Sequence, residues 1–222
     1  MLAPDNRIFY KKGLCGITNT QNTCFINTMI HCINANRDLA VIFFNKTYHI
    51  NISSPCKNII EQWIILSKFL WDKNCVITPT SFLNNLHNLL QTKKSNIVIG
   101  NHEDAQEFSQ LLLEFFHEGL SNKVKISIEG LPKNKIDKKA IVAYKIWKTF
   151  FENEFSPIIN MYFGQFNSII TKDNEITENY EPYSNISLDI PDTNYTTLYE
   201  CFNKFTAEEI IETGDTKVNI SK

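Results

Sequence analysis

The sequence lacks the long apolar segments of a membrane or secreted protein. No stretch approaches the roughly 18 consecutive apolar residues that a membrane-spanning helix needs. The segment Met1 to Arg7 also lacks an apolar core of signal-peptide length. We therefore expect a soluble, intracellular protein, cytoplasmic or nuclear, with no membrane partner.

The sequence also lacks the cysteine spacing of a zinc site or a disulfide framework. Its six cysteines include no Cys-x-x-Cys pair and no cluster with histidine at zinc-binding spacing, and they lie at positions 15, 24, 32, 56, 75 and 201. We expect reduced thiols inside a cell. We predict no metal and no cofactor.

There is no excess of positive charge. The chain has 22 Lys and Arg against 24 Asp and Glu, a formal net charge of -2. A sequence-independent grip on nucleic acid needs a basic face that displaces counterions, so we expect no nucleic-acid partner. A protein or peptide substrate suits this charge balance better. Across 222 residues, 43% hydrophobic content is enough to bury a core in one or two domains. The oligomeric state cannot be read from these properties.

Apolar periodicity predicts helices first and strands after them, an α+β order. The expected helices run from Cys24 to about Asn34, over 59–71, from Thr78 and Pro79 to Leu90, from about Asn101 to Leu120, and over 140–154. A basic loop is expected over 122–139. Short strands are expected over 161–171 and 183–190, with a final strand-rich piece ending at Lys222.

Cys24 is the leading candidate for chemistry because it lies between a polar turn and an apolar helical run. The first N–H groups of a helix carry partial positive charge, which favours the nucleophilic thiolate. Asn19, five residues upstream, can offer a side-chain amide donor to an oxyanion. The alternatives are an inert core thiol at Cys24 and an ordinary turn asparagine at Asn19.

Three ordered blocks carry a family resemblance. The first runs from Gly16 to Asn27 and contains Asn19, Asn22, Thr23, Cys24 and Phe25; the second runs from His102 to Phe108 and continues to His117 and Glu118; the third includes Trp147, Ser156, Ile158, Ile159, Phe163, Gly164, Gln165, Ser168, Glu181, Pro182, Tyr183, Ser187 and Leu188. Together they resemble the ubiquitin-specific proteases, a family of papain-like cysteine peptidases also called ubiquitin carboxyl-terminal hydrolases.

The resemblance implies a fold, an activity and three site residues. The expected fold is the α+β ubiquitin-specific protease fold, with a helical thumb over residues 1–130 and an incomplete, strand-rich fingers and palm part over 131–222. The implied activity is thiol-dependent hydrolysis of the peptide or isopeptide bond after the carboxy-terminal glycine of ubiquitin, with ubiquitin or ubiquitinated proteins as partners. Cys24 matches the nucleophile, Asn19 the oxyanion donor, and Asp104 the carboxylate that holds the ubiquitin tail. Helix capping is the alternative for Asp104.

The chain departs from the family pattern at three places. Gln21 replaces the glycine before Asn-Thr-Cys, so a turn that favours positive φ must accept a side chain. His102 and Glu103 replace paired glutamines. The positions of the family's zinc ribbon hold no cysteine, since the first pair aligns with 172–175 and the second with 219–221.

No histidine matches the family's general base. The five histidines are at 31, 49, 87, 102 and 117, and none lies in the glycine-flanked block where the family has its base. We therefore expect the amino-terminal part or a shortened form of a deubiquitinase. The alternatives are a non-catalytic ubiquitin-binding relative and a truncated fragment without the base.

Overall fold

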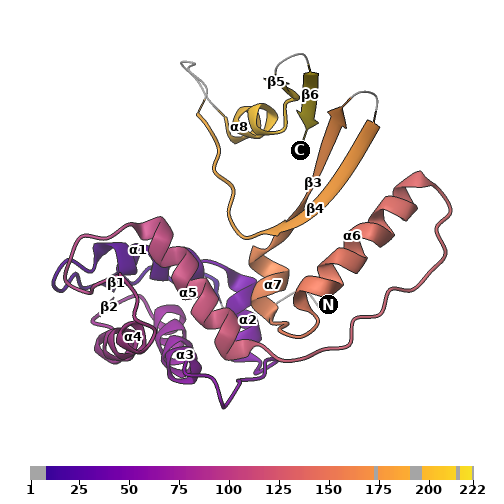
Figure 1. Cartoon of the computed structure of the whole chain (residues 1–222). Coiled ribbons are helices and arrows are strands. Elements are labelled where there is room, and N and C mark those ends of the chain that lie inside the picture. The colour runs from indigo at the N-terminus through magenta and orange to yellow at the C-terminus, as the bar shows by residue number, and fades with distance from the viewer. Residues whose placement is uncertain (1–8, 173–174, 191–196, 214–215, 222) are drawn as a thin grey trace. The chain divides into compact units, whose positions relative to one another are not determined.

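A computed structural model describes residues 9–172, 175–190, 197–213 and 216–221 of the chain (Figure 1). The chain forms two compact units. Unit 1 combines Met1–Val124 with Asn153–Met161, and unit 2 combines Lys125–Glu152 with Tyr162–Lys222. In the described ranges we find no helix that is both long enough and apolar enough to cross a membrane.

Unit 1 is a helical unit with one short parallel strand pair. Its elements are β1 (Gly16–Ile17), α1 (Cys24–Asn34), α2 (Arg37–Phe44), α3 (Lys57–Asp72), β2 (Val76–Ile77), α4 (Thr80–Thr92), α5 (Ala105–Leu120) and all but the last residue of α7 (Pro157–Tyr162). The strands pair with Gly16 opposite Val76 and Ile17 opposite Ile77. This pairing fixes the segment that leads into Cys24.

The core of unit 1 forms where apolar residues recur at helical spacing on α3, α4 and α5. Trp63 lies at its centre and is 1% exposed. Its ring centroid is 6.0 Å from that of Phe82 and 5.0 Å from that of Phe116. Burial of such large aromatic side chains contributes several kcal/mol, which makes this cluster the main anchor of the three helices.

Unit 2 pairs a long helix with a four-stranded antiparallel sheet. Its elements are α6 (Lys135–Phe151), β3 (Gly164–Lys172), β4 (Glu175–Tyr183), α8 (Leu198–Phe205), β5 (Glu209–Thr213) and β6 (Thr216–Ser221). The strand order is β4-β3-β6-β5. Gln165 Nε2 on β3 donates to Ala143 O on α6 at 3.2 Å, and Lys139 on α6 forms an ion pair with Glu178 on β4.

The family's Phe-Gly-Gln and Glu-Pro-Tyr segments meet in the β3–β4 hairpin. Gly164 pairs with Tyr183. A Cβ atom at Gly164 would lie 2.4 Å from the Tyr183 ring, so a glycine is needed for this close approach. The Tyr183 ring also stacks on Phe166 with a centroid distance of 4.0 Å. Two sequence segments of the third block are therefore parts of one packing arrangement.

The long apolar helices of the sequence are confirmed, with corrections at their starts. The helix expected from Thr78 and Pro79 begins at Thr80, with Pro79 as the N-cap of α4, and the Thr78 hydroxyl donates to Thr18 Oγ1 at 3.1 Å. Helix α6 begins at Lys135 rather than Ala140, because Asn134 accepts a hydrogen bond from Asp137 N and caps a helix inside the expected basic loop. The first turn of α6 consists mostly of charged residues, so the apolar spacing that predicts a helix begins only after it.

Three helices and one strand position were not foreseen. Helix α2 follows α1 directly because Asn36, two residues after the expected end of the first helix, caps the next helix through Leu39 N. The short helices α7 and α8 lie in or next to segments where the sequence predicts strands, and neither helix was expected. The strand expected over 183–190 is wrong, since β4 occupies 175–183 and no strand follows before residue 190.

Candidate active site

The strand before Cys24 is held firmly in unit 1. Thr18 N donates to Ile77 O at 2.9 Å, which extends the pairing of β1 with β2 by one residue. From α1, Asn27 Nδ2 donates to Thr18 O at 3.2 Å, and Asn27 is 8% exposed. These bonds set the start of the turn and the start of α1 relative to each other.

Cys24 is the first residue of α1 and is exposed. The turn before it is strained, since Gln21 has φ 54° and Asn22 has φ 60°. The left-handed region costs about 1–2 kcal/mol for a residue such as Gln21, whereas asparagine adopts it more readily. The expectation that Gln21 must occupy a positive-φ position is thus confirmed. The turn projects the thiol from the surface at the head of a helix.

Asn19 is exposed and hydrogen-bonded within the same turn. Its Oδ1 accepts from Thr23 Oγ1 at 3.2 Å. Thr23 is 1% exposed, and its Oγ1 also accepts from Thr20 N at 3.1 Å. The amide of Asn19 therefore has its oxygen engaged and its NH₂ group available, the group that an oxyanion requires.

The second sequence block packs against the first through α1 and α5. Phe25, which follows Cys24, meets Phe108 edge to face with ring centroids 5.2 Å apart and an interplanar angle of 90°. Asn22 Nδ2 donates to Gly100 O at 2.9 Å. Gly100 has φ 108°, so this loop position favours glycine. The structure thus joins two motifs that lie about 80 residues apart, as the 78-residue separation of the Asn22–Gly100 bond shows.

Asp104 is the N-cap of α5. Its Oδ1 accepts from Gln106 N at 2.6 Å and from Glu107 N at 3.2 Å. The helix expected from about Asn101 begins later, since α5 starts at Ala105 and Glu103 Oε1 accepts from Val98 N in the preceding loop at 3.1 Å. Asp104 is exposed, so capping leaves its second carboxylate oxygen, Oδ2, at the surface.

The histidines show no catalytic geometry in the described ranges. No hydrogen bond joins any of them to Cys24 there. His31 is an exposed residue in the last turn of α1, and His87 Nε2 lies 3.0 Å from Gln91 Nε2. His117 Nδ1 lies 2.8 Å from Ser156 Oγ, and burial lowers the pKa of its ring against the opposing effects of Glu154 and Glu118. His117 therefore has a structural environment that joins the second and third blocks.

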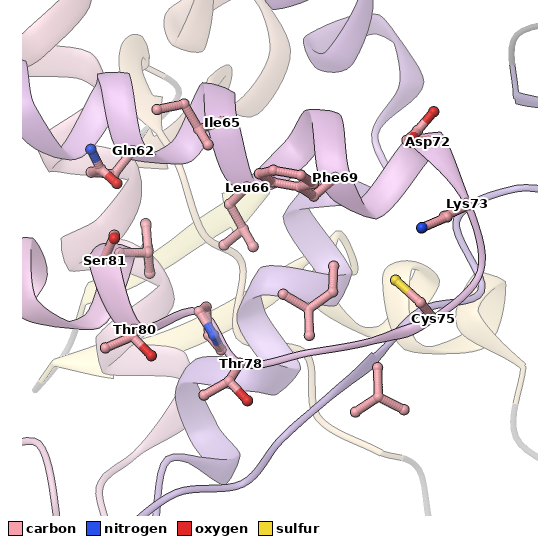
Figure 2. A pocket seen from close by; sticks show the side chains of 14 residues that line it. Gln62, Ile65, Leu66, Phe69, Asp72, Lys73, Cys75, Thr78, Thr80 and Ser81 are labelled. Atoms are coloured by element: carbon pink, nitrogen blue, oxygen red, sulfur yellow. The ribbon is translucent and has the colours of Figure 1, made fainter.

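Two cavities lie in unit 1. One of about 390 Å³ borders the turn before Cys24 and is lined by Thr20, Gln21, Thr23, Thr78, Thr80, Leu83, Asn84, His87 and Ile99. Another of about 660 Å³ lies between α3 and the segment from Asp72 to Phe82 (Figure 2). The two linings include none of the three predicted site residues. Within the described part of the chain, no group of three or more His, Cys, Asp or Glu could hold a metal ion. The aligned zinc-ribbon positions Asp173 and Asn174 lie outside the described residues.

Comparison with known proteins decides the family. The sequence profile of the family described as ubiquitin carboxyl-terminal hydrolase matches residues 15–215. The chain belongs to this family. As a ubiquitin carboxyl-terminal hydrolase relative it is 26% identical over 216 residues to ubiquitin carboxyl-terminal hydrolase Usp2 of Drosophila melanogaster, covering 96% of this chain and 22% of that protein. It is 28% identical over 219 residues to human ubiquitin carboxyl-terminal hydrolase 2, covering 93% of this chain and 35% of that protein.

The fold of this family member is confirmed as well. The whole chain matches 46% of a chain in the structure of the SAGA Ubp8/Sgf11/Sus1/Sgf73 DUB module bound to ubiquitin aldehyde, with a TM-score of 0.63 at 18% identity. This likeness shows the α+β ubiquitin-specific protease fold. The chain spans about a fifth to a third of the length of these curated relatives.

The sequence predicts Cys24, Asn19 and Asp104 as site residues, and the structure adds two residues that contact the same turn, Thr23 and Gly100. Thr23 was noted only as part of the Asn-Thr-Cys triplet, and Gly100 was not singled out. The signal for Thr23 is a threonine at a helix start with a polar residue four positions before it. Gly100 could have been flagged because a lone glycine between two motifs marks a special turn.

Proposed function

We propose that this chain carries the nucleophile, the oxyanion donor and part of the tail-binding site of a thiol-dependent deubiquitinase. The observation that carries the proposal is the joining of the Cys24 turn to the Asp104 helix by the Asn22–Gly100 hydrogen bond and the Phe25–Phe108 contact. A cysteine protease needs both parts at a fixed separation, because the attacked carbonyl and the bound peptide are one chain.

The chemistry assigned to the site is acyl transfer to sulfur. The Cys24 thiolate adds to the carbonyl carbon of the carboxy-terminal glycine of ubiquitin, and the negative charge moves to the carbonyl oxygen. The Asn19 NH₂ group and backbone N–H groups at the start of α1 donate to that oxygen. The tetrahedral intermediate collapses as the C–N bond breaks, and the leaving lysine amine takes the proton that a general base removed from the thiol before the attack. No histidine in the described ranges is hydrogen-bonded to Cys24, so we assign this base to none of them. Water then cleaves the C–S bond of the thioester, which releases the ubiquitin carboxylate and regenerates the thiol.

Asp104 is assigned to the ubiquitin tail through the oxygen that capping leaves at the surface. A carboxylate accepts hydrogen bonds from an arginine or from backbone N–H groups of an extended peptide. Capping and substrate binding are compatible here, because Oδ1 accepts both capping bonds. We assign the thumb to residues 1–130 and the start of the fingers and palm to 131–222.

We propose that the protein acts inside the cell. All six cysteines are free, the state in which cytosolic and nuclear thiols are kept. Ubiquitin or ubiquitinated proteins are the proposed partners, in line with the ubiquitin aldehyde bound to the DUB module of similar fold.

The test uses ubiquitin with a carboxy-terminal alkyne, which a positioned cysteine attacks without completing turnover. We expect one covalent adduct, mapped by mass spectrometry to Cys24 and abolished by Cys24→Ala. Cys32→Ala is the matched control, because Cys32 is a second exposed cysteine on the same helix. An adduct that persists in Cys24→Ala, or the absence of any adduct in the wild-type chain, would refute the proposal.

A second variant separates the two roles of Asp104. Asparagine caps helices as well as aspartate does, and Asn36 and Asn134 already do so in this chain. We expect Asp104→Asn to change the free energy of unfolding by less than about 0.5 kcal/mol while slowing adduct formation about tenfold, a loss typical of one charged contact. An unchanged adduct rate would limit Asp104 to capping.

A further inference from the structure

Thr23 precedes the nucleophile and is the N-cap of α1, yet its side chain makes no capping hydrogen bond. Elsewhere in the described chain, polar N-caps do accept from the first turn of their helices. Asp104, Asn36, Asn134 and Thr197 all do so. Thr197 shows that threonine is competent for this role here. The hydroxyl of Thr23 is instead committed to the turn before it.

The bonds of that hydroxyl fix the orientation of the Asn19 amide. Thr23 Oγ1 accepts from Thr20 N at 3.1 Å, so its single proton remains to be donated. The Asn19 side chain lies 3.2 Å away and presents Oδ1 to it. A carbonyl oxygen can accept that proton, whereas an NH₂ group cannot. Thr23 is 1% exposed, so water does not compete for the bond.

We propose that Thr23 is a positioning residue of the active site, which holds the Asn19 amide with its oxygen turned inward and its NH₂ group free for the oxyanion. This inference rests on the proposed function. A second effect accompanies it, because a hydroxyl that does not cap α1 leaves the first N–H groups of the helix without a side-chain acceptor. Those groups and the Asn19 amide can then serve the same substrate oxygen.

The test compares two ligands that differ in adduct formation at the tail carbonyl. Ubiquitin aldehyde adds reversibly to a thiol and forms a C–S bond and a tetrahedral centre whose oxygen needs donors, whereas unmodified ubiquitin forms neither. For Thr23→Val, which keeps the shape and loses the hydroxyl, we expect about tenfold weaker binding of ubiquitin aldehyde and unchanged binding of unmodified ubiquitin. Thr23→Ser should restore the affinity for the aldehyde.

A double-variant cycle tests whether Thr23 acts through Asn19. We expect Asn19→Ala to weaken aldehyde binding at least as much as Thr23→Val, and the combined variant to bind no more weakly than Asn19→Ala alone. Asn19→Asp keeps an acceptor for Thr23 but loses the NH₂ donor, so it should also lose affinity. Full aldehyde affinity in Thr23→Val, equal losses for both ligands, or additive losses in the double variant would each overturn the inference.

A measurement without ubiquitin keeps this inference separate from the proposed function. In the free protein, amide hydrogen exchange by NMR should be about tenfold faster at Thr20 in Thr23→Val than in the wild type, with the Asn19 side-chain amide signals shifted. Thr23→Ser should leave both unchanged. If the wild type binds neither ubiquitin ligand, the proposed function is wrong. The exchange data then decide by themselves whether the Thr23 hydroxyl organises the turn, and an unchanged exchange rate at Thr20 would overturn that role of Thr23.

Discussion

At the scale of single residues, Gln21 occupies a conformation for which its side chain is poorly suited. Its φ of 54° lies in the left-handed region. Glycine adopts this region without strain, although it loses more backbone entropy on folding. We expect Gln21→Gly to raise the free energy of unfolding by up to about 1 kcal/mol, measured by urea denaturation.

The matched control for Gln21→Gly is Gln62→Gly in the interior of α3. There the same exchange meets helical backbone, and we expect a loss of about 1 kcal/mol. Opposite signs at the two positions would identify backbone strain as the cause. A loss at Gln21 as large as that at Gln62 would contradict the strained-turn description.

One turn of sequence predicts Cys24 and Asn19 as site residues and a side chain at a positive-φ position at Gln21. The structure confirms the positive φ of Gln21. The orientation of the Asn19 amide was not predictable, because it depends on how the buried Thr23 hydroxyl divides its bonds between Thr20 and Asn19. Local hydrogen bonding of this kind competes with helix capping, and sequence alone does not say which prevails.

At the scale of elements, α5 and the segment returning to unit 1 are joined by a half-buried histidine, His117. Burial lowers the pKa of His117, beside the fully buried Ser156. The unfolded state therefore binds the proton more tightly than the folded state. Above the ordinary histidine pKa near 6.5, His117 is neutral in both states and the free energy of unfolding is not reduced. As the pH falls from 6.5 towards the lowered pKa of the folded state, the unfolded state gains its proton first and the free energy of unfolding decreases.

We expect the free energy of unfolding to decrease between pH 7 and pH 5, with a smaller decrease in His117→Gln. The control is His87→Gln, since His87 is exposed on α4. Chemical denaturation at several pH values makes the comparison. A pH slope in His117→Gln equal to that of the wild type would exclude His117 as its source.

Element prediction succeeded where apolar spacing was long and failed where capping decided the boundary. The apolar spacing in the sequence predicts α3 and α5, because each helix buries a broad apolar face. Asn36 and Asn134 each begin a helix that the sequence had assigned to a break or a loop. Asparagine favours turns and N-caps alike, so the residue type alone does not separate the two.

At the scale of the whole molecule, unit 1 is built from two separated stretches of chain. The second stretch is anchored by reciprocal hydrogen bonds at 2.9 Å between Asn122 and Phe155. Ile158 and Ile159 are both 0% exposed. The intervening segment before α6 is irregular and solvent-exposed, with Leu131 at 88%.

We expect limited trypsin digestion to cut first at the exposed lysines 123, 125 and 133. The two fragments should still elute together in size-exclusion chromatography and separate only in denaturant, because 153–161 stays packed in unit 1. The substitution Ile159→Asp should allow separation without denaturant. Fragments of the wild type that part in plain buffer would contradict this arrangement.

This discontinuity is the aspect of the whole molecule that sequence reading could not supply. The order of helices before strands predicted the α+β class, and the family blocks predicted the fold. The return of 153–161 to unit 1 depends on contacts more than 30 residues apart, such as the 39-residue separation of His117 and Ser156. No local pattern encodes such a contact.

The hydrogen bond from Asn22 to Gly100 fixes the distance between two parts of the site. It joins the turn that carries the sulfur to the loop that leads into Asp104, and the Phe25–Phe108 contact joins the helices α1 and α5 that follow them. Under the proposed function, a ubiquitin tail held at Asp104 presents a single peptide bond to Cys24. A tail lengthened by one glycine is then expected to bring the wrong carbonyl to Cys24, with its own scissile bond out of register.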